Sequence, residues 1–189
     1  MKTVLKLMMG CTILLSAGNI QAQDVRSQVI DNGGSGSCKA IMASDKSLPT
    51  HTIFKPQDLS KLGADNQMPI LVWGNGACAN SPHEHINFLN EIASHGMFVV
   101  AIGPMPGEGE VTRGQTASKL LTDAMDWAIA QNSDKNSLYY QKLNVDKIAA
   151  AGMSCGGLQT LDICQDPRLK TIMICNSGLF SNPTQAIPG

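Results

Sequence analysis

The sequence lacks a long apolar run: none reaches the roughly 18 residues that a membrane-spanning helix requires. It also lacks a surplus of basic residues, because 14 Lys and Arg residues stand against 15 Asp and Glu residues, which gives a net charge of -1. A nucleic-acid-binding surface is therefore not indicated. The 189 residues, 43% of them hydrophobic, have an ordinary globular composition and the length of one domain.

The N-terminus has the form of a secretory signal peptide. Lys2 and Lys6 precede an apolar stretch over about 7–17, and a small-residue exit follows at Ala22. Cleavage after Ala22 predicts an exported protein, periplasmic or extracellular. Two alternatives remain: a buried N-terminal helix, and a lipoprotein with Cys11 as the lipidated residue, for which the preceding regions are very short.

The cysteines lack C-x-x-C spacing, which argues against a zinc knuckle or a thioredoxin-type site. Five remain after signal cleavage: Cys38, Cys78, Cys155, Cys164 and Cys175. In an oxidising compartment some of them are expected to pair. Because five is odd, at least one is free or has its partner outside this chain.

The pattern predicts a signal peptide over 1–22, a flexible N-terminal segment over 23–45 and an incomplete folded domain over 46–189. Apolar runs predict strands over 49–56, 68–77, 97–104, 147–153 and 170–178. Helical patterns are found over 81–96, 115–132 and 155–164. Strands alternate with helices and the apolar runs are continuous, which predicts an α/β fold with a mostly parallel sheet and helices on both faces.

A glycine-flanked serine stands between the fourth of these strands and the last helix. Gly152-Met153-Ser154-Cys155-Gly156 matches G-x-S-x-G, the pattern of a nucleophile elbow when it joins a strand to a helix. Such a turn brings neighbouring backbone close, so side chains at 152 and 156 would collide with it. The turn also strains the backbone at the serine and projects Oγ outward. The alternative is a small-residue corner that packs helix on sheet.

A serine nucleophile also needs donors for an oxyanion. One is the N–H of Cys155, at the start of a helix whose dipole favours negative charge. The other comes from the loop after an earlier strand, and "WGNGAC" occupies that place. Gly74 and Gly76 allow close approach there, and the N–H of Asn75 is the candidate donor. The alternative is an ordinary glycine turn.

Five segments in order resemble the α/β-hydrolase superfamily: "VWGNGAC", "EIASHGMFVVAIGP", "GQTASKLLTDAMDWA", "KIAAAGMSCGGLQTL" and "DPRLKTIMICNSG". The resemblance covers about residues 50–180, and the similarity is to the dienelactone hydrolase, cutinase and polyester-hydrolase-like branch. The resemblance implies a nucleophile at Ser154, oxyanion donors at Asn75 and Cys155, and no metal or organic cofactor. Dienelactone hydrolases proper carry Cys at the centre of the elbow. Ser154 at that position favours a serine esterase.

The resemblance also implies a pairing of cysteines. Cys78 lies just beyond the proposed oxyanion loop and Cys155 lies on the elbow, and in this fold the two loops meet. We therefore expect a Cys78–Cys155 disulfide that holds both donors in place. The alternative is two buried free thiols.

A serine hydroxyl is a poor nucleophile without a base, and none is evident in the sequence. In this fold the triad runs Ser, then Asp or Glu, then His along the chain. Asp162 and Asp166 follow Ser154, but both lie directly after the elbow and neither matches the family's position for the acid. All the histidines precede Ser154, namely His51, His83, His85 and His95.

The predicted surroundings of these histidines argue against a catalytic or metal-binding role. His95 stands at the end of a predicted helix, where a structural role is expected. His83 and His85 are two residues apart and are expected to face different directions, and H-E-H is not the H-E-x-x-H pattern of zinc enzymes. His51 lies in an early strand, far from the elbow in this topology.

We therefore expect the triad acid and base to be encoded beyond residue 189. The chain would be a fragment of an exported serine hydrolase that cleaves small or polymeric carboxylic esters through an acyl-enzyme. Its sheet would lack the last strands, "TIMIC" would be an uncovered apolar edge, and activity would be very low. Two other functions remain open: a non-catalytic ligand-binding relative, and an amide or peptide hydrolase of the same fold.

Overall fold

The computed structural model describes residues 24–178, so the predicted signal peptide and residues 179–189 lie outside the described part. Within it, seven strands form one sheet in the order β1-β2-β3-β5-β4-β6-β7. The strands are β1 (Asp24–Val29), β2 (Ala40–Asp45), β3 (His51–Pro56), β4 (Met68–Gly74), β5 (Phe98–Ile102), β6 (Leu143–Met153) and β7 (Leu169–Cys175). The helices are α1 (Ile86–Ser94), α2 (Lys119–Ser133) and α3 (Cys155–Asp162), with short 3-10 turns η1 (Asp31–Gly33), η2 (Gly76–Cys78) and η3 (His83–His85).

The sheet is mixed but mostly parallel, as the sequence predicted. Strands β5, β4, β6 and β7 pair in parallel, whereas β1–β2, β2–β3 and β3–β5 pair antiparallel. Strand β2 therefore runs in the same direction as the parallel group, and only β1 and β3 oppose it. Each connection between the parallel strands contains a helix, because a parallel crossover must span the length of the sheet. These observations establish an α/β fold.

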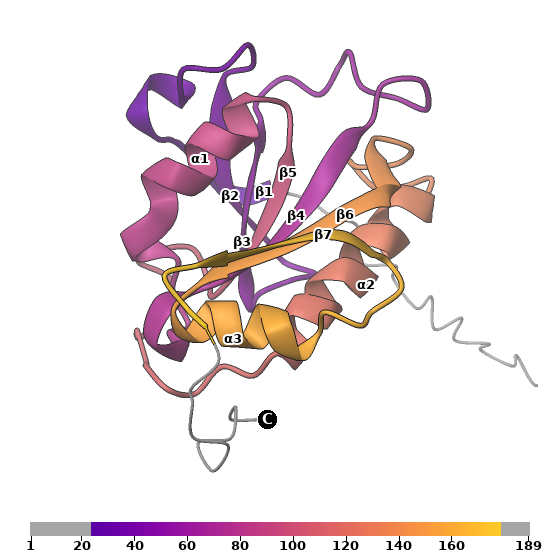
Figure 1. The fold of residues 1–189 in the computed structure, drawn as a ribbon. Helices are drawn as coiled ribbons and strands as arrows, with labels where there is room; N and C mark the ends of the chain where they lie inside the picture. Colours follow the sequence, from indigo (N-terminus) through magenta and orange to yellow (C-terminus); the bar gives the residue numbers. More distant parts are fainter. Residues whose placement is uncertain (1–23, 179–189) are drawn as a thin grey trace, which may run out of the picture.

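Helices cover both faces of the sheet (Figure 1), with α1 on one side and α2 and α3 on the other. Consecutive residues of β4 enter two separate cores, because side chains alternate across a strand. Ile70 and Val72 pack on the α2 side, whereas Leu71 and Trp73 pack on the α1 side. The continuous apolar runs are thus explained by burial on both faces. No helix in residues 24–178 is long and apolar enough to cross a membrane.

The prediction of a flexible segment over 23–45 is wrong for its described residues. Strand β1 forms one edge of the sheet, and β2 is buried along its whole length between β1 and β3. The glycines between them provide close approach to α1: a Cβ added at Gly34 would lie 2.6 Å from the Cβ of Ser94. Gly36 N also donates to Ser94 Oγ at 2.9 Å. Gly34 and Gly36 therefore serve close packing against α1.

Strand β7 forms the opposite edge of the sheet, where the sequence placed "TIMIC". Ile172 is 39% exposed and Met173 is 41% exposed. The expectation of a poorly covered apolar edge is confirmed for the described part of the chain.

Candidate active site

Ser154 lies at the sharp turn between β6 and α3, with φ 52° and ψ -116°. A positive φ is rare for a residue with a side chain and is typical of strained functional turns. The N–H of Ser154 donates to Cys175 O at 2.9 Å, and its carbonyl accepts from Gly157 N and Leu158 N at 2.9 and 3.2 Å. The backbone is therefore held by β7 and α3, while the side chain is exposed. No hydrogen bond to Ser154 Oγ is made by any residue within 24–178.

The two glycines that flank the serine are required by close packing. A Cβ at Gly152 would overlap the carbonyl group of Gly156. A Cβ at Gly156 would overlap the carbonyl group of Gly74 and would lie 2.7 Å from Asn75 N. Real Cβ atoms do not approach backbone so closely, so a methyl group at either position would force the strand, helix and loop apart. The collisions inferred from the motif are present.

The loop over residues 74–78, which we call the Asn75 loop, lies directly against the start of α3. Asn75 is only 2% exposed, and its Nδ2 donates to Ile102 O at 2.7 Å and to Ala79 O at 3.0 Å. These bonds fix the loop between β4 and β5. The N–H of Asn75 makes no backbone hydrogen bond within residues 24–178. The N–H of Cys155, in the first turn of α3, has no acceptor within the helix.

A disulfide joins the Asn75 loop to the elbow, as the sequence predicted. It links Cys78 to Cys155, whose Cα atoms are 5.2 Å apart. The other three cysteines of the described part, Cys38, Cys164 and Cys175, are free. The five cysteines of the described part therefore form one disulfide and leave three free thiols.

Gln159 was not identified from the sequence, although it lies beside the disulfide. It is buried on α3, and its Nε2 donates to Thr116 O at 2.6 Å and lies 3.6 Å from Cys78 Sγ. One signal was available. Gln159 is four residues after Cys155, so it lies on the same helix face, one turn further along.

His51 and His95 have structural partners. His51 Nε2 lies 3.0 Å from Leu120 O, and its Nδ1 lies 2.9 Å from Thr50 Oγ1. A carbonyl can only accept, so Nε2 carries the proton and Nδ1 accepts from the threonine. Burial lowers the pKa of His51 to about 4. Its strand is separated from β6 by β5 and β4, and His95 is bound to Glu91 at 3.0 Å.

His83 and His85, which the sequence predicts to face different directions, both lie on the 3-10 turn η3. Both border one small pocket of about 130 Å³ beside Asn75 and Gly76, with His83 exposed and His85 half-buried. The ring of His85 packs edge-on against Trp73 with centroids 5.2 Å apart. Burial lowers the pKa of His85. Within residues 24–178, no group of three or more potential ligands is arranged to hold a metal ion.

The two aspartates after the elbow have partners elsewhere. Asp162 accepts a hydrogen bond from the hydroxyl of Ser118, at the start of α2. Asp166 is bound by Arg168 in a two-pronged pair, with Nε to Oδ1 at 2.9 Å and Nη2 to Oδ2 at 2.6 Å. Neither contacts a histidine. The described residues therefore bring together the serine and the two candidate donors, without an acid–base pair.

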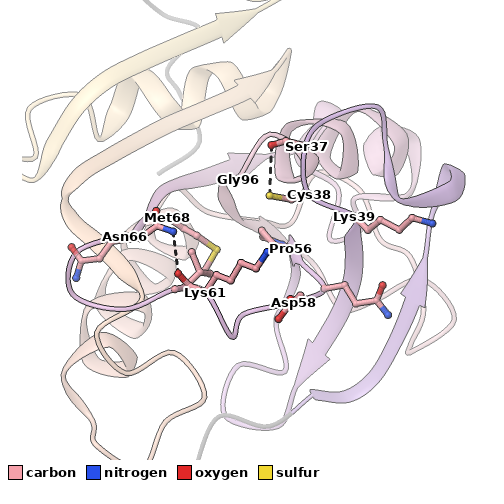
Figure 2. Close-up of a pocket in the computed structure, with 12 residues that line it drawn as sticks. Ser37, Cys38, Lys39, Pro56, Asp58, Lys61, Asn66, Met68 and Gly96 are labelled. Carbon is pink, nitrogen blue, oxygen red and sulfur yellow. Dashed lines mark hydrogen bonds between the residues drawn. The ribbon is translucent and has the colours of Figure 1, made fainter.

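A larger pocket of about 450 Å³ lies elsewhere (Figure 2). It is lined among others by Cys38, Lys61 and Met68, and by Gly96, which shortly precedes β5. These positions place it at the amino ends of the parallel strands, whereas Ser154 follows the carboxyl end of β6. In parallel α/β sheets ligands bind outside the carboxyl ends. The pocket is thus separate from the elbow.

Comparison with models of protein families gave no match, and neither did comparison with the sequences of characterised proteins.

Proposed function

We propose that this protein is a serine hydrolase of the α/β-hydrolase type that cleaves carboxylic esters through an acyl-enzyme. One observation carries the proposal: Ser154 has a positive φ between a parallel strand and a helix, with its backbone bonded and its hydroxyl exposed. A positive φ is energetically costly for serine, whereas glycine adopts it without that cost. Packing alone would therefore favour glycine at this position. Strain of this kind is concentrated at functional turns.

In the proposed reaction, Ser154 Oγ attacks the carbonyl carbon of the ester and its proton passes to a general base. The tetrahedral oxyanion is held by the N–H groups of Asn75 and Cys155, which make no backbone hydrogen bond within residues 24–178. Collapse expels the alcohol, which takes the proton from the base, and leaves the acyl group on Ser154. Water then attacks the acyl carbon while the base takes its proton. The base returns this proton to Ser154 Oγ as the carboxylic acid is released.

The general base and its orienting acid would come from outside residues 24–178. His51 and His95 are bonded to other groups, and Asp162 and Asp166 are bonded to Ser118 and Arg168. His83 and His85 border the pocket beside Asn75, but within residues 24–178 neither ring is hydrogen-bonded to Ser154 or to a carboxylate. Because an isolated oxyanion hole retains only a small part of the rate enhancement, residues 24–178 alone would hydrolyse esters very slowly.

The test uses an active-site-directed fluorophosphonate on the natural full chain. We expect covalent labelling, located at Ser154 by peptide mass spectrometry and abolished in Ser154→Ala. A matched control is Ser177→Ala, since Ser177 lies near Gly157 on the same side of the site and has no proposed role. Labelling that persists in Ser154→Ala would exclude the nucleophile.

The absence of any hydrogen bond to Ser154 Oγ within the described residues favours one alternative, a ligand-binding protein that retains the turn. A full chain that neither labels nor turns over p-nitrophenyl esters would support it. Equal rates on an ester and its matched anilide would instead indicate an amide hydrolase. We also propose export, since the Cys78–Cys155 disulfide needs an oxidising compartment to persist.

A further inference from the structure

Gln159 is a polar side chain on α3 that is only 1% exposed. A buried carboxamide is costly unless its groups are bonded, so its contacts indicate what the residue is for. Its nitrogen has two hydrogens to donate and its oxygen can only accept.

The donor end of Gln159 holds the segment that precedes α2. Nε2 donates to Thr116 O at 2.6 Å and lies 3.1 Å from Thr116 Oγ1. The same segment is bonded to the Asn75 loop, because Gly114 N donates to Ala77 O at 2.8 Å and Thr116 N donates to Cys78 O at 3.3 Å. Gln159 thus closes a ring of contacts from α3 through Thr116 to the Asn75 loop.

The carboxamide also contacts the Asn75 loop at both of its ends. At the far end, Nε2 lies 3.6 Å from Cys78 Sγ. At the near end, Oε1 accepts no hydrogen bond from the described residues and packs beside the backbone of Gly74, where an added Cβ would be 3.1 Å from it. Asn75, the proposed oxyanion donor, stands between these two contacts.

We propose that Gln159 is a positioning residue for the oxyanion hole, which sets the distance between the Asn75 loop and the first turn of α3. This rests on the proposed function. The Cys78–Cys155 disulfide ties only one end of the loop to the elbow. Gln159 packs against the other end at Gly74 and holds the loop through Thr116, so the disulfide and Gln159 together would fix the positions of both candidate donors.

A positioning role predicts a loss confined to the transition state. The oxyanion exists only there, so a displaced donor lowers kcat and leaves substrate binding nearly unchanged. Gln159→Met keeps the size of the side chain and removes its polar contacts. We expect kcat about ten- to a hundredfold lower, less than the loss of a whole donor, with KM within about threefold of wild type.

The experiment compares Gln159→Met with Gln165→Met in the natural full chain. Gln165 is an exposed glutamine in the turn after α3 and makes no contact with the Asn75 loop, so its variant should match wild type. Ester kinetics are measured with hydrogen exchange of the peptide that spans 74–79. We expect exchange there to be about tenfold faster in Gln159→Met, with the disulfide still closed by intact mass.

Each outcome bears on the proposal. Unchanged kcat in a folded Gln159→Met variant overturns it, and so does unchanged exchange over 74–79. If the wild-type chain shows no labelling or turnover, the proposed function fails, but the exchange data still test whether Gln159 positions the loop. If Gln159→Met does not fold, Gln159→Glu keeps the shape and replaces donation with repulsion at Thr116 O. Wild-type exchange and kcat in that variant would equally overturn the proposal.

Discussion

At the scale of single residues, the position of Gly156 is set by two neighbouring peptide groups. Its α-carbon faces the carbonyl of Gly74 and the nitrogen of Asn75, and no side chain fits between them. This contact brings the elbow and the Asn75 loop together, and it depends on a missing methyl group rather than on an added interaction.

Gly156→Ala is therefore expected to lower the free energy of unfolding by about 2–3 kcal/mol, because the added methyl must displace backbone. Urea unfolding followed by circular dichroism measures the change. Gly63→Ala is the matched control, since a Cβ at Gly63 meets nothing within 4 Å. It should stay within about 0.5 kcal/mol of wild type. Equal effects of the two substitutions would contradict the packing argument.

His51 gives the protein a predictable dependence on pH. Its pKa is lowered from 6.5 to about 4 by burial, so the folded state resists protonation that the unfolded state accepts. The stability that this contributes is fully present above about pH 6.5 and is lost as the pH falls toward 4.

Between pH 7.5 and 4.5 wild type should lose about 2 kcal/mol more stability than His51→Gln. Glutamine keeps a donor for Leu120 O and does not titrate. Urea unfolding at both pH values tests the difference. Parallel pH profiles for the two proteins would show that His51 is not the titrating group.

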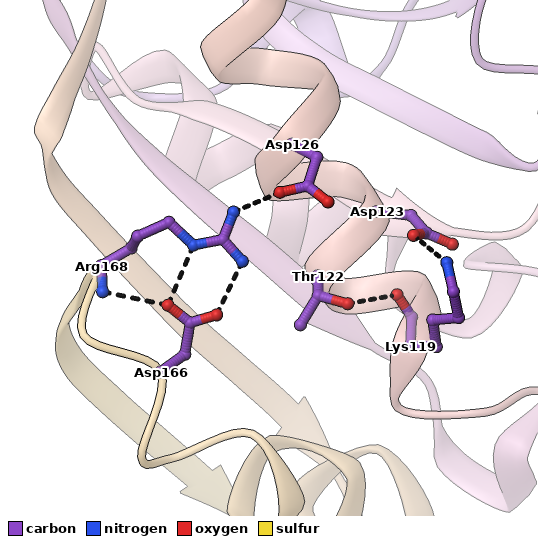
Figure 3. A network of polar contacts seen from close by, with 6 residues as sticks. All are labelled: Lys119, Thr122, Asp123, Asp126, Asp166 and Arg168. Atoms are coloured by element: carbon purple, nitrogen blue, oxygen red, sulfur yellow. Dashed lines mark hydrogen bonds and ion pairs between the residues drawn. The ribbon is translucent and has the colours of Figure 1, made fainter.

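At the scale of elements, one arginine joins the turn after α3 to α2 (Figure 3). Arg168 binds both oxygens of Asp166 and also reaches Asp126 on α2. The guanidinium holds the pKa of Asp166 at about 2. Arginine suits this position because its planar fork matches a carboxylate in two places.

Arg168→Met should lower the free energy of unfolding by about 1 kcal/mol at pH 6, since the pair is only partly shielded from water. The contribution of Asp166 is fully present above about pH 3.8 and is lost as the pH falls through about 2. The control is Lys119→Met, which removes the exposed Lys119–Asp123 pair on α2 and should cost less than 0.5 kcal/mol or so. A larger loss from the control would refute the ranking.

At the scale of the whole molecule, the Cys78–Cys155 disulfide links positions 77 residues apart. A bond across so long a segment restricts the unfolded chain strongly, and removing it should lower stability by about 2–4 kcal/mol. Reduction with a dithiol should reproduce this loss in wild type and have no effect on the Cys78→Ala/Cys155→Ala double variant.

The pairing itself is open to a chemical check. Alkylation of the denatured protein without reductant should modify Cys38, Cys164 and Cys175 and leave Cys78 and Cys155 unmodified. Peptide mapping reads the result directly. An alkylated Cys78 or Cys155 in the unreduced sample would contradict the disulfide.

Local chemistry in the sequence determined the α/β class, the turn at Ser154 and the need for glycine at 152 and 156. These follow from burial on both sheet faces and from the steric demands of a strand-to-helix turn. Both constraints select the types of residues that are neighbours in the sequence. The disulfide followed from the resemblance, since its partners are far apart in the chain.

Only the tertiary structure decided the roles of residues whose neighbours are distant in sequence. Strand β1 is defined by its pairing with β2, because its mostly polar sequence has no apolar pattern that would predict a strand. The contacts of Gln159 are with Thr116 and Gly74, which lie 43 and 85 positions before it in the chain. Contacts of this kind depend on how the sheet and helices stack, and the local pattern of a short helix contains no record of them.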